Sequence, residues 1–227
     1  MHGALRLRLC FDQAVAYLAG TSYQKSMIRT IRSLLAFPQA YQLFWTVIGG
    51  PQRSRILVDE YIRPKAGDRI LEIGCGPGTI VPYLPQCEYV GFDMSADYVA
   101  QASKKFPQAR FVCERVSEYT LKERSYFDSV LALGIVHHLD DPEALQLFQI
   151  AHEALKPGGK LVTLDGVWSK GQSAGARALL ARDRGEFIRD EESYLGLASR
   201  AFDNVKVSIR HDLLRIPYTH IILECIR

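Results

Sequence analysis

The sequence predicts an α/β fold built on a doubly wound, mostly parallel sheet of seven strands. From residue 67 onward, short β-rich runs alternate with segments of helical periodicity. The strand runs are continuously apolar, which is typical of a parallel sheet covered by helices on both faces. The last two runs are joined by a short loop containing Pro217. Because parallel strands need a long crossover, we expect these two to be antiparallel neighbours.

Each predicted element can be placed by residue number. We expect strands over 69–73, 89–92, 110–113, 129–133, 160–164, 205–210 and 219–225. Between them we expect helices over about 79–84, 96–106, 142–155, 174–184 and 190–201. The regular alternation, without internal repeats, indicates one α/β core rather than several domains.

The first 64 residues have a different pattern. Apolar residues such as Val15, Leu18 and Leu34 recur at helical spacing, and strand alternation is missing. A helix is expected over 52–61, with Pro64 marking its end. We therefore expect residues 1–64 to form a helical cap or lid, and residues 65–227 to form the core of the single domain.

Length and composition exclude several classes of protein. The chain has 227 residues, 48% of them hydrophobic, which suffices for a full-sized core. Its net charge of +3 is small, and Lys and Arg form no stripe, so nucleic acid is not an expected partner. No run approaches the roughly 18–20 apolar residues of a membrane span, and the first residues lack a signal-peptide pattern. We expect a cytoplasmic protein with no membrane partner; its oligomeric state is left open.

The cysteines suggest a reducing compartment. Five are scattered along the chain: Cys10, Cys75, Cys87, Cys113 and Cys225. They form no CxxC pair and no Cys/His array with zinc spacing. We therefore expect neither disulfides nor a metal site.

A glycine-rich turn ends the first predicted strand, in the run ILEIGCGPG of residues 70–78. Glycines at this place let a ligand approach the backbone closely, because no Cβ intervenes. A tight turn without a ligand would show the same glycines. The spacing is G-x-G-x-G rather than the G-x-G-x-x-G that seats a pyrophosphate, which argues against a nicotinamide-dependent enzyme.

Two acidic residues strengthen the ligand interpretation. Glu72 lies inside an otherwise apolar strand, where an ionised group needs a partner. Asp93 follows the second strand, roughly 20 residues past the glycines, where an acid can bind ribose hydroxyls. Helix capping is the alternative role for Asp93, but Ser95 already suits that purpose.

These residues carry a family resemblance. Residues 72–78 resemble motif I of the class I S-adenosylmethionine-dependent methyltransferases, and Asp93 stands at that family's ribose-binding acid. The run FDSVLALGIVHHL, residues 127–139, is similar to the fourth-strand motif, and LKPGGKL, residues 155–161, to the turn into the fifth strand. Four motifs in family order cover residues 67 to about 165. The resemblance is closest to the ubiquinone-biosynthesis-like group of small-molecule methyltransferases.

The resemblance implies S-adenosylmethionine as cofactor, S-adenosylhomocysteine as product and a small molecule as methyl acceptor. The implied cofactor-binding residues are Glu72, Gly74, Cys75, Gly76, Gly78, Asp93, Met94, Val116, Leu133 and Gly134. Asp93 would bind both ribose hydroxyls, and Met94 would pack on the adenine. The sequence departs from the family at 113–116, where the family often has an acid for the adenine amino group. Backbone groups near Val116 are the candidates for that contact.

In this chemistry the protein mainly aligns a nucleophile and, where needed, removes its proton. The candidates for a general base at the carboxyl ends of the strands are His137, Asp165 and His220. Each also has an ordinary alternative. His137 could be buried in packing, Asp165 could be a turn residue before Gly166, and His220 could belong to an edge strand.

Acceptor binding is assigned to residues near the end of the chain and after the fifth strand. The candidates are Trp168, Arg215 and Tyr218, with packing or solvation as the alternative for each. Tyr218 and His220 alternate with Thr219, so they would face the same side. Four arginines, at 177, 182, 184 and 189, precede the sixth strand, and most are expected on solvated helix faces. A cluster of them facing the cleft would favour an acidic or phosphorylated acceptor.

Two other functions fit the same fold. An RNA or protein methyltransferase is disfavoured because the sequence lacks an Asn/Asp-Pro-Pro-Tyr/Phe motif, a catalytic cysteine motif and a basic stripe. A non-catalytic cofactor-binding scaffold would retain the fold without activity. The intact glycine turn and Asp93 argue against the scaffold.

Overall fold

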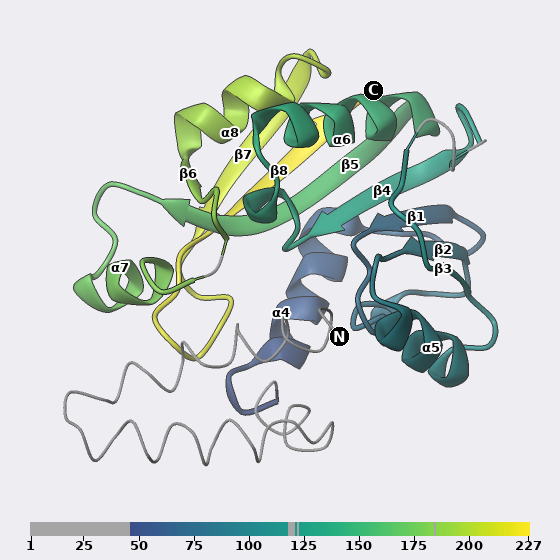
Figure 1. The fold of residues 1–227 in the computed structure, drawn as a ribbon, viewed down its shortest axis with the longest axis horizontal. Coiled ribbons are helices and arrows are strands. Elements are labelled where there is room, and N and C mark those ends of the chain that lie inside the picture. The colour runs from purple at the N-terminus through teal and green to yellow at the C-terminus, as the bar shows by residue number, and fades with distance from the viewer. Residues whose placement is uncertain (1–45, 118–120, 122, 184) are drawn as a thin grey trace.

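The sheet predicted from the sequence is present in a computed structural model of the chain, which describes residues 46–117, 121, 123–183 and 185–227. Seven strands cross it in the order β3-β2-β1-β4-β5-β8-β7 (Figure 1). Their bounds are β1 (Arg69–Ile73), β2 (Glu88–Phe92), β3 (Arg110–Val112), β4 (Phe127–Leu133), β5 (Leu155–Trp168), β7 (Asn204–Arg210) and β8 (His220–Ile226). The part of the predicted helical cap over residues 1–45 lies outside the described residues.

Strand directions agree with the prediction. The neighbours among β1 to β5 pair in parallel, whereas β8 is antiparallel to both β5 and β7. A mostly parallel seven-stranded sheet with an antiparallel last strand is therefore confirmed. A further strand, β6 (Arg189–Asp190), pairs with Val167 and Trp168 at the end of β5. Its two residues are too few to produce a sequence pattern.

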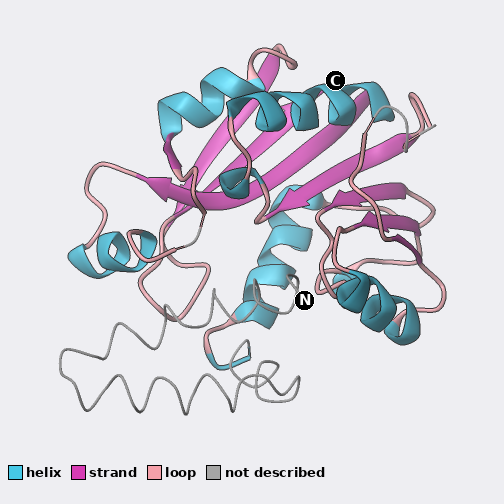
Figure 2. Ribbon diagram, viewed as in Figure 1, coloured by secondary structure: helices cyan, strands magenta, loops and turns pink. Residues whose placement is uncertain are grey.

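Helices cover both faces of the sheet (Figure 2), as the doubly wound prediction requires. On one face lie α6 (Asp141–Ala154) and α8 (Glu191–Ala198). On the other lies α4 (Gly50–Ile56), continued by a π-helical segment, Leu57–Ile62. Two more helices, α5 (Ala96–Lys105) and α7 (Ala174–Leu180), follow β2 and β5. No helix among the described residues is long and apolar enough to cross a bilayer.

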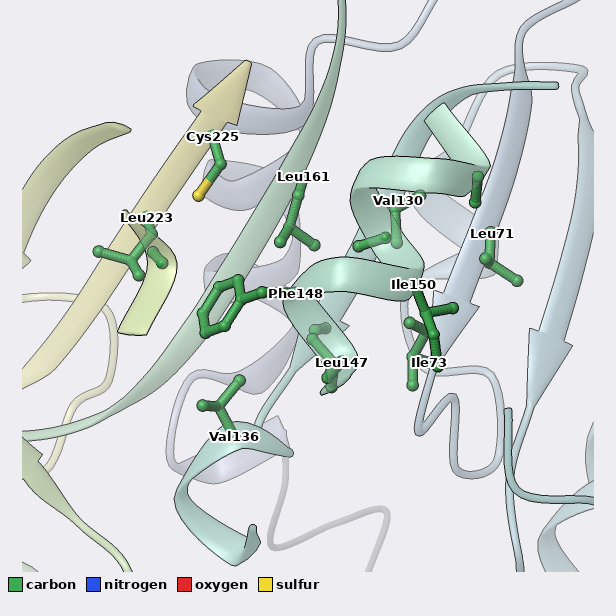
Figure 3. Close-up of a cluster of buried hydrophobic side chains, with 14 of the residues drawn as sticks. Leu71, Ile73, Val130, Val136, Leu147, Phe148, Ile150, Leu161, Leu223 and Cys225 are labelled. Carbon is green, nitrogen blue, oxygen red and sulfur yellow. The ribbon is translucent and has the colours of Figure 1, made fainter. Parts of the chain in front are cut away.

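Each face of the sheet buries its own hydrophobic cluster. Phe148 of α6 packs with Val130 of β4 in the cluster shown in Figure 3. The next strand residue, Leu131, faces the opposite side and packs with Leu57 and Ile62. This alternation is the ordinary consequence of the strand's two-residue period. Residues 50–62, assigned from the sequence to the cap, thus form one of the two layers that cover the sheet.

The helix predicted over 79–84 is wrong. Only a 3-10 turn, Val81–Tyr83, forms there. Pro85 disfavours the helical conformation of the residue before it, and Leu84 is accordingly extended, with φ −79° and ψ 146°. Two later helices are shorter than predicted, since α7 ends at Leu180 and α8 at Ala198.

The strand arrangement brings distant segments to one edge of the sheet. The parallel strands β1, β4 and β5 end there. Because β8 is antiparallel to β5, its first residue, His220, pairs with Gly166 at the same edge. Ligands of open α/β sheets bind outside this carboxyl edge.

Replacing Phe148 with alanine tests the cluster under α6. Its side chain is fully buried, so Phe148→Ala should lower the free energy of unfolding by about 3–5 kcal/mol. Urea titration followed by circular dichroism measures the change. Gln149→Ala, on the exposed side of the same helix, is the control and should change stability by less than about 0.5 kcal/mol. Equal effects of the two substitutions would contradict this packing.

Candidate functional site

A cavity of about 290 Å³ opens at the carboxyl edge of β1, β4 and β5. Its polar lining includes residues from separate parts of the chain, among them Glu72 in β1, His137 after β4, Asp165 in β5 and His220 in β8. Its apolar walls are formed by Ile48, Leu57, Ile80, Leu133, Leu164, Leu179, Leu214 and Ile216. A few polar groups set in apolar walls are typical of a small-molecule site.

The glycine turn forms one wall of the cavity. Gly74 and Gly76 have φ values of 75° and 52°, in the left-handed region that favours glycine. No atom outside the adjoining residues lies within 4 Å of where a Cβ on Gly76 would stand, so a ligand can reach the backbone there. Asp93 holds the turn, because its Oδ2 accepts the N–H of Gly76 at 2.8 Å. Its Oδ1 accepts the N–H of Ser95, the residue that caps α5.

The side-chain carboxyl group of Glu72 is buried at the base of this wall. It is 3% exposed, and the hydroxyl of Tyr89 donates to its Oε2. Burial raises the pKa of Glu72 to about 8, against the lowering effects of the Tyr89 hydrogen bond and the Arg53 charge. Glu72 is therefore largely protonated near neutral pH when no further cation is beside it.

His137 and Asp165 form a buried pair. Asp165 Oδ1 accepts the backbone N–H of His137 at 3.1 Å and lies 2.7 Å from the Nδ1 of the same residue. Burial disfavours the imidazolium, but the hydrogen bond and charge of Asp165 outweigh it and raise the pKa of His137. Since Nδ1 is turned to the carboxylate, Nε2 is the nitrogen left to meet a ligand.

His220 has the opposite electrostatic setting. It is 4% exposed, and burial together with the charge of Arg53 lowers its pKa well below the ordinary value. Its imidazole is therefore neutral near neutral pH. Its Nδ1 has no hydrogen-bond partner among the residues that the structure describes. The ring lies 4.7 Å from that of Tyr218, so the prediction that these two side chains face the same side is confirmed.

Tyr218 closes the cavity beside His220. Its hydroxyl donates to Asp183 Oδ2 at 2.5 Å, and both residues line the cavity. A Cβ at residue 166 would lie 2.5 Å from this hydroxyl. Glycine at 166 therefore allows Tyr218 to pack against the end of β5.

The structure brings most of the predicted site residues together. Those that line the cavity are Glu72, Gly74, Cys75, Gly76, Leu133, Gly134, His137, Asp165, Tyr218 and His220. The other predicted residues lie outside its lining: Gly78, Asp93, Met94, Val116, Trp168 and Arg215. Met94 is 67% exposed beside Asp93, and exposed Arg215 donates to the carbonyl of Val47.

Sequence reasoning missed Arg53 and Asp183, which both line the cavity. Neither belongs to a recognisable motif, and each reaches the wall only because segments far apart in the chain pack together. Of the arginines between β5 and β7, Arg177 and Arg182 are exposed, as expected, but the side chain of Arg189 is only 8% exposed. Among the described residues, none of these arginines lines the cavity. The described part of the segment between β5 and β7 thus places no arginine cluster in the cavity that could bind an acidic acceptor.

Comparison with known proteins gives one family match. Residues 70–159 match the model of a methyltransferase domain. The chain is 27% identical over 167 residues to phosphoethanolamine N-methyltransferase 1 of Triticum aestivum, covering 71% of this chain and 33% of that protein. It is 25% identical over 130 residues to the ubiquinone biosynthesis O-methyltransferase of Xanthomonas axonopodis pv. citri, covering 52% of this chain and 54% of that protein. The chain thus spans between a third and about half of these relatives.

A solved structure shares the fold. It is phosphoethanolamine N-methyltransferase 2 of Haemonchus contortus, in complex with phosphomonomethylethanolamine and S-adenosylhomocysteine. The TM-score is 0.61 at 18% sequence identity, over 78% of this chain and 52% of that chain. The likeness supports the Rossmann-like fold of this chain.

The buried carboxyl group of Glu72 predicts a pH-dependent stability. Its pKa is higher in the folded chain, about 8, than the ordinary 4.5, so folding takes up a proton between these values. This favourable contribution is complete below pH 4.5 and is lost as the pH rises toward 8, by about 1.4 kcal/mol per pH unit. Glu72→Gln has no carboxyl group to titrate at this position, so it should lose less stability between pH 4.5 and pH 8. Denaturant unfolding without ligand at pH 5, 6.5 and 8 measures both chains; parallel curves would exclude a raised pKa at Glu72.

Proposed function

We propose that this chain, which belongs to the class I S-adenosylmethionine-dependent methyltransferases, transfers a methyl group from that cofactor to a small-molecule acceptor. The observation that carries the proposal is that one cavity joins the glycine turn to the His137–Asp165 pair. One half of the cavity suits the cofactor and the other suits proton removal from an acceptor.

The residues of the first half fit the cofactor. S-adenosylmethionine supplies, when bound, an electrophilic methyl group on a sulfonium, and it also carries an ammonium and a ribose. The open backbone at Gly76 leaves room for a ligand, and buried Glu72, when ionised, has the charge that complements an ammonium. A cation beside Glu72 would favour its ionised form, which burial alone disfavours. We assign Gly74, Cys75 and Gly78 to the same turn, and Leu133 with Gly134 to the wall beside the sulfonium.

We assign the binding of the cofactor's adenosine part to residues outside the cavity wall. The Asp93 carboxylate has four acceptor sites, of which Gly76 and Ser95 use two, so both of its oxygens can still accept ribose hydroxyls. Exposed Met94 is assigned to the adenine face, and the backbone near Val116 to the adenine edge. These assignments follow the family resemblance of the motifs.

His137 is assigned as the general base. Asp165 fixes the ring through Nδ1 and stabilises the imidazolium that forms when Nε2 takes a proton. His220 is the poorer base, because burial holds it neutral and no carboxylate contacts it among the described residues. We therefore assign His220 and Tyr218 to hydrogen bonding with the acceptor, and Asp165 to orienting His137.

Cavity size and walls support a small acceptor. A volume of about 290 Å³, partly needed for the cofactor, admits a small molecule. Ile48 and Arg53 reach this cavity from the region expected to be the cap, which supports a covering role for residues 1–64 over a core of 65–227. Arg215 stands between the lining residues Leu214 and Ile216, and Trp168 is the last residue of β5. We retain both as candidates for an outer acceptor contact.

Cofactor binding is tested by Asp93→Ala. The substitution removes both a ribose ligand and the support of the Gly76 N–H, so affinity for S-adenosylhomocysteine should fall at least about tenfold. Isothermal titration calorimetry measures the affinity. Asp97→Ala, an exposed acid in the first turn of α5, removes the same charge nearby and should leave affinity unchanged. Failure of the folded, unmodified chain to bind either S-adenosylmethionine or S-adenosylhomocysteine would refute the proposal.

Methyl transfer is tested with His137→Gln. Acceptors are first identified by screening small alcohols, phenols and amines for formation of S-adenosylhomocysteine. With an active acceptor, His137→Gln should lower kcat by about 10²–10⁴-fold while cofactor affinity is retained. Since the neutral imidazole is the base, the wild-type rate should rise with pH through a pKa above 6.5. His152→Gln, on α6 away from the cavity, is the control; an unchanged rate in His137→Gln would remove the base role.

A further inference from the structure

Arg189 holds the turn that carries His137. The turn is a 3-10 segment, Val136–His138, between β4 and α6. The guanidinium of Arg189, in β6, donates from Nη1 to the carbonyl of Val136 at 3.2 Å and from Nη2 to that of Leu139 at 2.8 Å. Its Nε and Nη2 also donate to Asp141 Oδ1, at 2.9 and 2.6 Å. One planar side chain thus spans both ends of the turn and the start of α6.

The segment that leads into β6 also contacts His137 directly. The N–H of Phe187 donates to the carbonyl of His137 at 3.1 Å. Gly185 lies against the ring, since a Cβ there would stand 2.2 Å from His137 Cδ2. The ring is therefore held between Asp165 on its Nδ1 side and the backbone of residue 185 on its Cδ2 side.

We propose that Arg189 is a positioning residue for His137: it clamps the turn so that the imidazole stays against Asp165 with Nε2 directed to the acceptor. The inference rests on the proposed role of His137 as base. An ordinary surface ion pair would explain only the contact with Asp141, which is 73% exposed. It would not explain an arginine side chain, only 8% exposed, that donates to the carbonyls of Val136 and Leu139 at the two ends of the turn.

The charge of Arg189 and its clamp act on His137 in opposite directions. Several groups face the imidazole: Asp165 in β5, Asp183 after α7, Arg189 in β6, His138 on the same turn and His220 in β8. The nearby positive charge of Arg189 lowers the pKa of His137, whereas the Asp165 contact, which the clamp maintains, raises it. If Arg189 acts only through its charge, removing the guanidinium should raise the pKa of His137. If Arg189 also maintains the Asp165 contact, removing it should lower that pKa.

The experiment is an NMR titration of the His137 imidazole in Arg189→Lys and Arg189→Met, with saturating S-adenosylhomocysteine. Lysine keeps the charge but cannot reproduce the planar fork. If Arg189 positions the turn, both substitutions should lower the pKa of His137, because the contact with Asp165 is lost. Arg189→Met should lower it less than Arg189→Lys, because it also removes a positive charge that lowers this pKa. If Arg189 acts only as a charge, Arg189→Met should raise the pKa and Arg189→Lys should leave it unchanged. That second pattern, or no change in either variant, overturns the proposal.

Two further measurements make the result decisive. Arg182→Met removes a positive charge from the segment between β5 and β6, where exposed Arg182 donates to the carbonyl of Ala178. This control should leave the titration of His137 unchanged. Thermal unfolding of each sample establishes that the chain is folded, and Arg189→Lys decides the question where Arg189→Met does not fold.

The titration also separates this inference from the proposed function. Full methyl transfer by His137→Gln would remove the base role, yet a lowered pKa of His137 in both Arg189 variants would still establish the clamp. Loss of activity in His137→Gln with an unshifted titration would leave the base role and remove the clamp. With both intact, Arg189→Lys should lower kcat more than it raises KM, because the contact acts on proton transfer rather than on binding.

Discussion

The parallel pairing of β1, β4 and β5 is the constraint on which the site depends. Parallel neighbours must each return by a crossover, so the three strands end at the same edge of the sheet. The glycine turn, His137 and Asp165 are thereby brought to one cavity although nearly a hundred residues separate the first from the last. The antiparallel β8 adds His220 from the opposite direction. No single segment of the chain contains the site.

Burial gives the ionisable groups of this cavity their different roles. Glu72 and His220 both lie in the interior without an opposite charge in direct contact among the described residues, and burial drives each toward its neutral form. His137 is equally buried, but the carboxylate of Asp165 reverses the outcome and raises its pKa. Two histidines on the same edge therefore differ in basicity, because among the described residues a carboxylate is hydrogen-bonded to His137 but not to His220.

The site also depends on side chains that pack directly against the backbone of glycines. Glycine at 166 admits the hydroxyl of Tyr218, and glycine at 185 admits the ring of His137. In both places a single Cβ would occupy the space of a functional side chain. The glycines of the turn at 74 and 76 serve a different purpose, since their positive φ angles shape a backbone that a ligand can approach. Only the glycines at 74 and 76 belong to a motif that can be recognised in the sequence.

The sequence by itself determined the succession of strands and helices along the chain, the glycine turn, Glu72 and the residues after β4. Periodicity and local motifs depend on near neighbours in the chain, so they can be recognised without the fold. It also suggested His137, Asp165 and His220, since these follow or begin strands. The failed helix over 79–84 shows the limit of periodicity beside Pro85. Tertiary structure alone decided which histidine contacts an acid, that Arg53 and Asp183 line the cavity, and that Arg189 faces inward. Those outcomes depend on packing between segments far apart in the chain, which local patterns do not encode.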